Sequence, residues 1–589
     1  DVDEAINIFG TDNAISNSGL LRAGGSGIRI DGGYNFISNS GEILSYSSGI
    51  YILSGYDDFV SNSGVIRSES ADGVSFSGTD NRFVNSETGE VYSGSLAVDH
   101  GVEFLSGTEN SVENHGTIYG GGYGVIFYAP EVEAGNHTLL NTGSIFGSNY
   151  NGVRMSGGSG TITNSGLISS TGNSYAVFMD ESDNIITNTG EILGENGGVF
   201  FGSSDDINSI SNYGLISTSE NSGIYSNSDS SYIYNGADAE VVSLSGAAIF
   251  VGGAEARIIN EGVLGSPSHR AINSSASDYL YVDNAGTISA QNSAIYTNGD
   301  DTVIKNSGTL SSEISSTVLS VSLTGSFRLI NSGTISTTST GQATIDVSAF
   351  DADVQITNSG LITSSAIGQY AIDAYTTDTG ELTLRNFGTI EGNLHLNAPS
   401  VTVRSENGEI DGTIILYGDA EARLFLGDEA NAVVDQGMQA DRFDLGGGAD
   451  LVDYVYSTSG VHVDLATGNG YSGYAQGDRL IDVENLYGSA FEDLLLGDGL
   501  ANELTGDAGD DELSGRAGND LLQGGADNDD LLGGSGFDTL IGGTGGDDLT
   551  GGADADVFLY ETISDSAVTG VGRDRIMDFE QDVDLIDLS

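Results

Sequence analysis

Apolar and polar residues alternate in short runs along the first 400 residues, and Gly, Asn and Ser interrupt these runs every few positions. The segment 166–190, GLISSTGNSYAVFMDESDNIITNTG, is typical of the pattern. Strict alternation over a few residues, rich in β-branched side chains, indicates a half-buried β-strand. No stretch has a convincing helical period. The pattern therefore predicts many short strands joined by tight turns.

A longer repeat organises these strands. Asn, any residue, Gly, any residue and an apolar residue recur every 21 to 29 positions, with looser copies at Asn85 and Asn235 and a weak last copy at Asn407. A repeat of this length predicts about sixteen coils of a parallel β-helix over residues 1–410, because one coil cannot bury its apolar face alone. The clear copies begin at Asn17, Asn39, Asn62, Asn114, Asn141, Asn164, Asn188, Asn212, Asn260, Asn284, Asn306, Asn331, Asn358 and Asn386.

The conserved spacing of Asn and Gly also predicts a specific corner in each coil. The Gly fits a left-handed turn, and we expect the Asn side chains to stack from coil to coil and form hydrogen bonds along the turn. Independent β-sandwich domains are the alternative, but they have no need for Asn and Gly at one corner of every repeat. The repeats resemble those of bacterial surface adhesins and autotransporter passengers, which implies an adhesive or structural role.

A second repeat, nine residues long, occupies Gly488 to Leu559. Eight copies run in one frame, from GSAFEDLLL to GGADADVFL. Position one is always Gly and position eight is always apolar. Position six is Asp in seven of the eight copies and Asn502 in the other. A flexible acidic, Gly-rich linker would need neither the constant frame nor the apolar eighth position.

These nonapeptides resemble the RTX family, in which each repeat is a turn followed by a short strand and two repeats make one coil of a parallel β-roll. Glycine permits turns that direct carbonyl groups inward, and a carboxylate at position six adds the hard oxygen ligands that Ca²⁺ prefers. We therefore expect Ca²⁺ to be the cofactor. The residues predicted to build its sites are Asp493, Asp511, Asp520, Asp529, Asp538, Asp547, Asp556, Gly506, Gly509, Gly515, Gly518, Gly524, Gly533, Gly536, Gly542 and Gly545.

The two-repeat coil divides position six into two columns, one with Asp493, Asp511, Asp529 and Asp547, the other with Asn502, Asp520, Asp538 and Asp556. Some copies depart from the pattern. Asn502 lacks the charge, Asp527 and Asp554 replace turn glycines, and the first two repeats have poor turns. We therefore expect better sites between Gly506 and Asp556 than before them.

The segments on either side of the nonapeptides complete the predicted organisation. Residues 411–487 are expected to be transition strands. Residues 560–589 are similar to the C-terminal cap of serralysin-type and other RTX proteins, which precedes an export signal for type I secretion; we expect this cap to be truncated. The serralysin protease is not expected, because no His is followed by Glu and the HExxH motif is therefore missing.

Charge and composition restrict the function further. The chain has 85 acidic and 17 basic residues, a formal net charge of −68, which disfavours binding to nucleic acid or anionic membranes and attracts multivalent cations. There is no Cys and no apolar run long enough for a transmembrane helix. The 38% hydrophobic content argues against disorder.

The sequence thus predicts an all-β protein: a parallel β-helix followed by a calcium-binding RTX β-roll, secreted or attached to a bacterial surface, with a structural or adhesive role. Copies of itself and surface glycans are the expected partners, with the first coils, lacking an obvious cap, as one contact for self-assembly. The alternative is a polysaccharide-modifying lyase or epimerase on the β-helix. Its candidate residues, Arg154 near Asp180 and Glu181 or His269 and Arg270 near Asp283, are too sparse for a basic groove, so no enzyme is expected.

Overall fold

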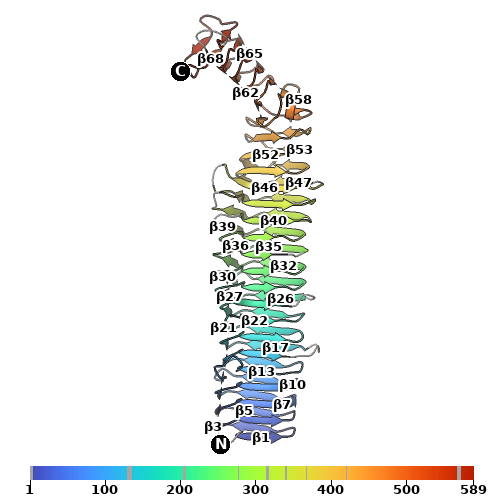
Figure 1. Ribbon diagram of the computed structural model, residues 1–589, viewed down its shortest axis with the longest axis vertical. Helices are drawn as coiled ribbons and strands as arrows, with labels where there is room; N and C mark the ends of the chain where they lie inside the picture. The colour runs from blue at the N-terminus through green and yellow to red at the C-terminus, as the bar shows by residue number, and fades with distance from the viewer. Residues whose placement is uncertain are drawn as a thin grey trace. The chain divides into compact units, whose positions relative to one another are not determined.

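The computed structural model describes residues 4–128, 135–202, 207–275, 278–313, 317–338, 341–365, 368–377, 379–418, 421–566 and 572–588. The chain divides into two compact units, Asp1–Ser320 and Val321–Ser589. Each is a parallel β-solenoid, as the sequence predicted (Figure 1). One short 3₁₀ turn, Gly473–Ala475, is the only helical element of the described residues, and no helix among them could cross a membrane.

The first unit has three strands in each coil. The first coil contains β1 (Ile6–Phe9), β2 (Ala14–Asn17) and β3 (Leu20–Ala23), and β37 (Ile295–Thr297), β38 (Asp301–Asn306) and β39 (Thr309–Ser312) repeat the arrangement at the other end of the unit. Equivalent strands of successive coils pair in parallel and form three sheets, here called the first, second and third sheet after β1, β2 and β3.

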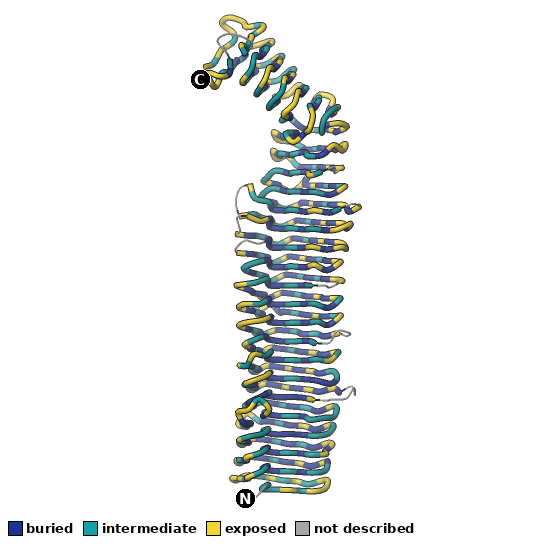
Figure 2. Tube along the Cα trace, in the orientation of Figure 1, coloured by how far each residue is buried: buried dark blue, intermediate teal, exposed yellow. Residues whose placement is uncertain are grey.

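Buried and exposed residues alternate along the trace of the first unit (Figure 2), and its buried apolar side chains are mostly aliphatic and form columns from coil to coil. In the first sheet, for example, Ile28 is in register with Ile50, and Ile50 with Val74. All three side chains are fully buried. Because alternate residues of a strand point to opposite faces, each coil places one apolar set inside, and β-branched residues pack well on such a surface. The alternation read from the sequence is therefore the cause of the solenoid.

The predicted asparagine stack is confirmed. In the first unit the side-chain Nδ2 of each corner Asn donates to Oδ1 of the corner Asn in the next coil, at 2.7–2.9 Å, without a break from Asn17 to Asn306. The looser copies Asn85 and Asn235 take part fully. In the second unit the stack runs from Asn331 through Asn358 and Asn386 to the hydroxyl of Ser405.

The left-handed turn expected of the corner glycines is wrong: Gly41, Gly166 and Gly214 are not among the glycines of positive φ. Glycine is needed there because the coils approach closely, so that a Cβ on Gly166 would meet the carbonyl oxygen of Gly143 in the preceding coil.

The second unit changes from three strands per coil to two. The third sheet ends at β51 (Glu409–Asp411), and later strands alternate between the first and second sheets. The first sheet continues through β52 (Thr413–Tyr417), β54 (Ala432–Gln436), β56 (Leu451–Asp453), β60 (Asn485–Tyr487), β62 (Glu503–Ala508), β64 (Leu521–Ala526), β66 (Thr539–Thr544), β68 (Val557–Leu559) and β70 (Leu585–Asp587). The second sheet continues through β53 (Glu421–Phe425), β55 (Arg442–Asp444), β57 (His462–Asp464), β59 (Arg479–Ile481), β61 (Leu494–Leu496), β63 (Glu512–Ala517), β65 (Asp530–Ser535), β67 (Asp548–Ala553) and β69 (Arg575–Ile576).

One insertion interrupts the two-strand coils. β57 pairs antiparallel with β58 (Asn469–Ser472), and the chain then returns through β59 to pair with β55. β57 itself pairs with β61. The strands before and after the hairpin, β55 and β59, are therefore neighbours in the second sheet. The exact limits of the four segments expected from the sequence stay predictions.

Candidate metal site

The nonapeptides form coils of two repeats each. Strands in the same sheet are in register 18 residues apart, so that Leu513 is opposite Leu531 and Leu522 is opposite Leu540. All eight apolar residues at position eight are fully buried. They fill the space between the two sheets, and this fixes the face to which the preceding position-six side chain turns.

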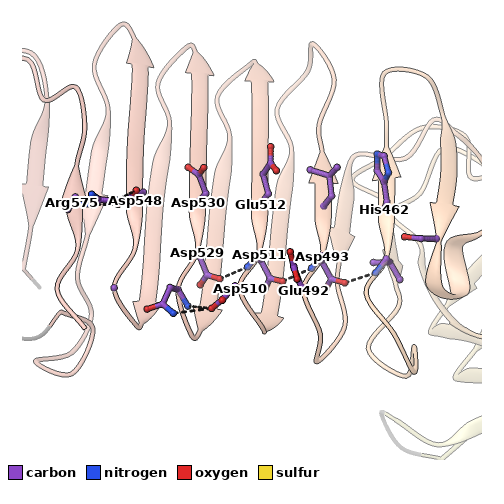
Figure 3. A pocket seen from close by; sticks show the side chains of 15 residues that line it. His462, Glu492, Asp493, Asp510, Asp511, Glu512, Asp529, Asp530, Asp548 and Arg575 are labelled. Atoms are coloured by element: carbon purple, nitrogen blue, oxygen red, sulfur yellow. Dashed lines mark hydrogen bonds and ion pairs between the residues drawn. The ribbon is translucent and has the colours of Figure 1, made fainter. Parts of the chain in front are cut away.

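The position-six side chains form two ladders, one at each edge of the coils. The backbone N–H of Asp493 donates to Oδ1 of Asp511, and the same contact links Asp511 to Asp529 and Asp529 to Asp547, at 2.8–2.9 Å (Figure 3). The second ladder runs in the same way from Asn502 through Asp520 and Asp538 to Asp556, at 2.8–3.0 Å. The two predicted columns are thus present in the structure, and every member is at most 3% exposed.

The glycine at position one makes room for the carboxylate. A Cβ placed on Gly524 would meet Oδ2 of Asp529 and the carbonyl oxygen of Gly542 in the next coil. The same conflict with the position-six oxygen occurs at Gly506, Gly515, Gly533 and Gly542. Position one is therefore glycine because the carboxylate of its own repeat lies against it.

Glycine at position four serves the turn. Gly509, Gly518 and Gly536 have φ of 122°, 130° and 126°, a region that L side chains rarely adopt. At Gly545 a Cβ would meet the carbonyl oxygen of Asp527. The departures noted in the sequence carry a backbone cost, because Asp527 and Asp554 have φ of 80° and 82° at this position.

One oxygen of each central carboxylate lacks a partner. Oδ1 accepts the ladder hydrogen bond, but the buried Oδ2 has no hydrogen-bond partner in Asp511, Asp520, Asp529, Asp538, Asp547 and Asp556. A buried, unpaired carboxylate oxygen is costly unless a cation or a proton neutralises it. Burial accordingly raises the pKa of Asp511 to about 7, of Asp529 to about 8 and of Asp547 to about 6. A row of such oxygens beside turn carbonyl groups fits Ca²⁺.

The first two repeats differ from this row. Both oxygens of Asp493 accept hydrogen bonds from Ser489, and Oδ1 also accepts the N–H of Val461. Asn502 accepts from the N–H of Asp498 and donates to the carbonyl oxygen of Glu484. These two side chains are satisfied within the protein. The weaker sites expected before Gly506 remain a prediction, and this hydrogen bonding supports it.

The ladders extend beyond the nonapeptides, which the sequence analysis did not foresee. The N–H of Asp547 donates to Asp574 and that of Asp556 to Asp584, both at 3.1 Å. Upstream, the N–H of Asn431 donates to Asp450 and that of Ala422 to Asp441. A sequence signal existed: Asp, Arg and an apolar residue occupy positions six to eight of a degenerate repeat at 441–443, 478–480 and 574–576.

An acidic depression of about 580 Å³ lies beside the first ladder (Figure 3). Glu512, Asp530 and Asp548 occupy position seven of alternate repeats, in register on the outer face of the second sheet. Glu492 and Asp510 also line it. Arg575 forms an ion pair with Asp548 and is the one arginine that lines the depression. A buried ladder aspartate is therefore followed directly by a carboxylate on the outer surface, as in Asp511 and Glu512 or Asp529 and Asp530, where the strand begins.

The candidate catalytic residues of the first unit make local contacts. Arg154 forms an ion pair of 3.0 Å with Asp180 and lies over the ring of Phe178. Arg270 lies 3.5 Å from the centre of the Tyr296 ring, and Asp283 accepts a hydrogen bond from Tyr281. Both arginines are therefore engaged in contacts with neighbouring side chains of the solenoid.

Comparison with known proteins agrees with the repeat geometry. The model of the RTX calcium-binding nonapeptide repeat matches four overlapping segments, 487–522, 496–531, 505–540 and 523–558. No curated protein sequence matches the chain. Ca²⁺ is the ion that this repeat family implies, and the unpartnered Oδ2 atoms fit it. Residues 487–558 of this β-solenoid protein are RTX calcium-binding repeats.

Proposed function

We propose that this protein is a secreted calcium-binding solenoid with a structural or adhesive role at a bacterial surface or in an extracellular matrix. The observation that carries the proposal is the double ladder of buried aspartates with unpartnered Oδ2 atoms, within RTX repeats. RTX proteins are typically secreted by type I systems. The low calcium of a cytosol leaves such carboxylates unneutralised, and external calcium would stabilise the folded coils.

The proposed ligands are the carboxylates of Asp511, Asp520, Asp529, Asp538, Asp547 and Asp556, together with turn carbonyl groups shaped by the glycines at positions one and four. Asp493 is a weaker candidate because Ser489 already satisfies both of its oxygens. Each Oδ1 stays in the ladder while Oδ2 would contact the ion. In the folded coils the ladder thus fixes the orientation of each carboxylate.

The partners proposed are other copies of this chain and anionic surface glycans. Support comes from the acidic depression, because Glu512, Asp530 and Asp548 would bind a bridging Ca²⁺ only together with carboxylates of a second molecule. The net charge of −68 keeps copies apart without calcium. A non-enzymatic role is part of the proposal, since the candidate arginines of the first unit are engaged in surface contacts.

Carboxylates at neighbouring positions of the chain provide the test. Asp511→Asn with Asp529→Asn removes two ladder charges, whereas Glu512→Gln with Asp530→Asn removes two charges one residue further along. We expect the ladder variant to lose calcium ions and calcium-induced thermal stabilisation, and the outer variant to retain both but to bind calcium-dependent partners less well. Calcium titration, thermal melts, light scattering and glycan binding measure these effects. Equal loss of bound calcium in the two variants would contradict the assignment of the ladder.

A further inference from the structure

Three buried aspartates converge upstream of the nonapeptides, in the second unit. Asp435 points inward from β54, Asp441 immediately precedes β55, and Asp478 immediately precedes β59. One carboxylate oxygen from each lies within 4.8 Å of those from the other two. The side chains are 1%, 3% and 1% exposed. These three residues, here called the aspartate triad, lie outside residues 487–558, which match the RTX repeats.

Hydrogen bonds hold each member of the triad in place. Oδ1 of Asp441 accepts the N–H of Ala422 at 2.7 Å, and Oδ1 of Asp478 accepts the N–H of Asp441 at 2.9 Å. The hydroxyl of the fully buried Tyr454 donates to Oδ2 of Asp478 at 2.8 Å. The orientation of these carboxylates is therefore fixed by backbone and side-chain donors around them.

Asp435 gives an independent indication of a ligand. Its Oδ1 accepts the N–H of Gly437 at 2.9 Å, but its Oδ2 is buried without a hydrogen-bond partner. Asp435 also occupies an interior strand position, where the neighbouring inward residue Val433 is apolar and fully buried. An acid there is costly unless something in the triad neutralises it.

No basic side chain of the described residues forms an ion pair with the triad. Burial, with the neighbouring carboxylates, raises the pKa of Asp435 well above its usual value; burial also raises the pKa of Asp441 to about 8 and of Asp478 to about 7. Three carboxyl groups close together must share protons or a cation.

We propose that the aspartate triad, Asp435, Asp441 and Asp478, is a buried Ca²⁺ site separate from the nonapeptide ladder. Carboxylate oxygens are the ligands that Ca²⁺ prefers, and three of them converge with one oxygen already free of hydrogen bonds. The ion would join β54, β55 and β59, the strands before and after the inserted hairpin. It would thus hold together the strands on both sides of the inserted hairpin and stabilise the two-strand coils before the RTX repeats.

Ion counting on the full chain tests the proposal. Asp435→Asn keeps the size of the side chain, and Asp444→Asn, on the outward face of β55, is the matched control. With ⁴⁵Ca equilibrium dialysis at saturation, we expect Asp435→Asn to bind one ion fewer than the wild type and Asp444→Asn to bind the same number. The Asp511→Asn, Asp529→Asn variant separates the two proposals, because the triad would retain its ion even if the ladder bound none.

Terbium luminescence gives a second readout that keeps all three carboxylates. The chain has no Trp, so tyrosine sensitises bound Tb³⁺, and Tyr454 is in contact with the triad. We expect Tyr454→Phe to reduce tyrosine-sensitised emission, and the exposed Tyr456→Phe to leave it unchanged. The reduction should vanish when Asp435→Asn is also present. If Asp435→Asn does not fold, as judged by circular dichroism, Tyr454→Phe decides alone. An unchanged ion count in folded Asp435→Asn, or unchanged emission in Tyr454→Phe, would overturn the proposal and leave a network of protonated carboxyl groups.

Discussion

At the scale of single residues, the nonapeptide is a device for placing one carboxylate oxygen in a confined space. The position-eight side chain fixes the inward face, the ladder hydrogen bond holds Oδ1, and the position-one glycine leaves room for Oδ2. Asp at position six thus places its Oδ2 directly against the glycine of its own repeat. Each of these roles makes a different substitution informative.

The space beside the carboxylate predicts the effect of adding one methyl group. Gly524→Ala would push against Oδ2 of Asp529 and the next coil, and we expect a loss of about 1–3 kcal/mol in stability from overpacking. Calcium affinity should fall about tenfold, which corresponds to about 1.4 kcal/mol. Gly499→Ala is the control, because a Cβ there has no atom within 4 Å. Thermal melts and calcium titrations of both variants measure the difference; similar behaviour of the two would refute the steric role of position one.

At the scale of elements, stacked polar side chains accompany the apolar columns of the solenoid. Asn164, for example, is fully buried and donates through Nδ2 both to Asn188 of the next coil and to the carbonyl of Gly166, two residues later. Since each amide connects two coils, removing one leaves unsatisfied groups on both sides. The register of the coils is thus specified by hydrogen bonds as well as by aliphatic packing.

The asparagine stack predicts a large effect from a single truncation. Asn188→Ala would leave Nδ2 of Asn164 and Oδ1 of Asn212 without their stacking partner. We expect a loss of about 2–4 kcal/mol in the free energy of unfolding, because both groups are buried. The exposed Asn173→Ala should cost less than about 0.5 kcal/mol. Chemical denaturation followed by circular dichroism compares the two, and equal midpoints would show that the stack adds nothing.

Cross-strand neighbours of like charge predict a pH effect in the second unit. Asp346 on β43 (Ile345–Ala349) is opposite Asp373 on β46 (Tyr370–Thr376), and burial, then Asp373, raises the pKa of Asp346 to about 6. A raised pKa stabilises the folded state while the group is protonated. This contribution is full below about pH 4 and is lost as the pH rises through about 6. Relative to Asp346→Asn, the wild type should therefore lose about 1 kcal/mol between pH 4 and pH 7, after allowance for partial exposure. Parallel pH profiles of the two proteins would contradict this assignment.

At the scale of the whole molecule, the excess of acid couples folding to calcium. The ladders concentrate carboxylates in the RTX coils, whereas the first unit is held by aliphatic columns and asparagine stacks that need no ion. Calcium that binds the folded coils and not the unfolded chain stabilises the folded coils by mass action. Folding of the RTX coils should therefore depend on calcium. The first unit should be folded both with and without calcium.

Limited proteolysis distinguishes the two parts within one chain. Arg516 lies in β63 of the RTX coils, and Arg154 lies in β19 (Val153–Ser156) of the first unit. With chelator we expect trypsin to cleave after Arg516 at least tenfold faster than with millimolar calcium, because cleavage follows the population of the opened coils. Cleavage after Arg154 should be slow in both. Mass spectrometry identifies the cuts, and calcium-independent cleavage after Arg516 would rule out calcium-dependent folding of these coils.

The sequence by itself determined the strands, the coil repeats, the asparagine stack and the two columns of position-six residues. These features depend on local periodicity, and identical repeats must stack in register to bury their identical apolar faces. The nine-residue spacing of Gly506 and Asp511 from the equivalent residues of the next repeat, Gly515 and Asp520, was likewise readable without coordinates. By contrast, the extension of the ladders to Asp441, Asp574 and Asp584 had too weak a signal, because those copies lack most of the glycines.

Only the tertiary structure decided the aspartate triad. Asp435 and Asp478 are separated by a hairpin that belongs to no repeat, so no periodicity relates them. They meet because β59 returns to pair with β55 after the insertion, and because Asp435 takes an inward position that the strand pattern would assign to an apolar residue. The reduction from three strands to two was also hidden, since the loss of one sheet depends on how coils pack and not on the alternation within any strand.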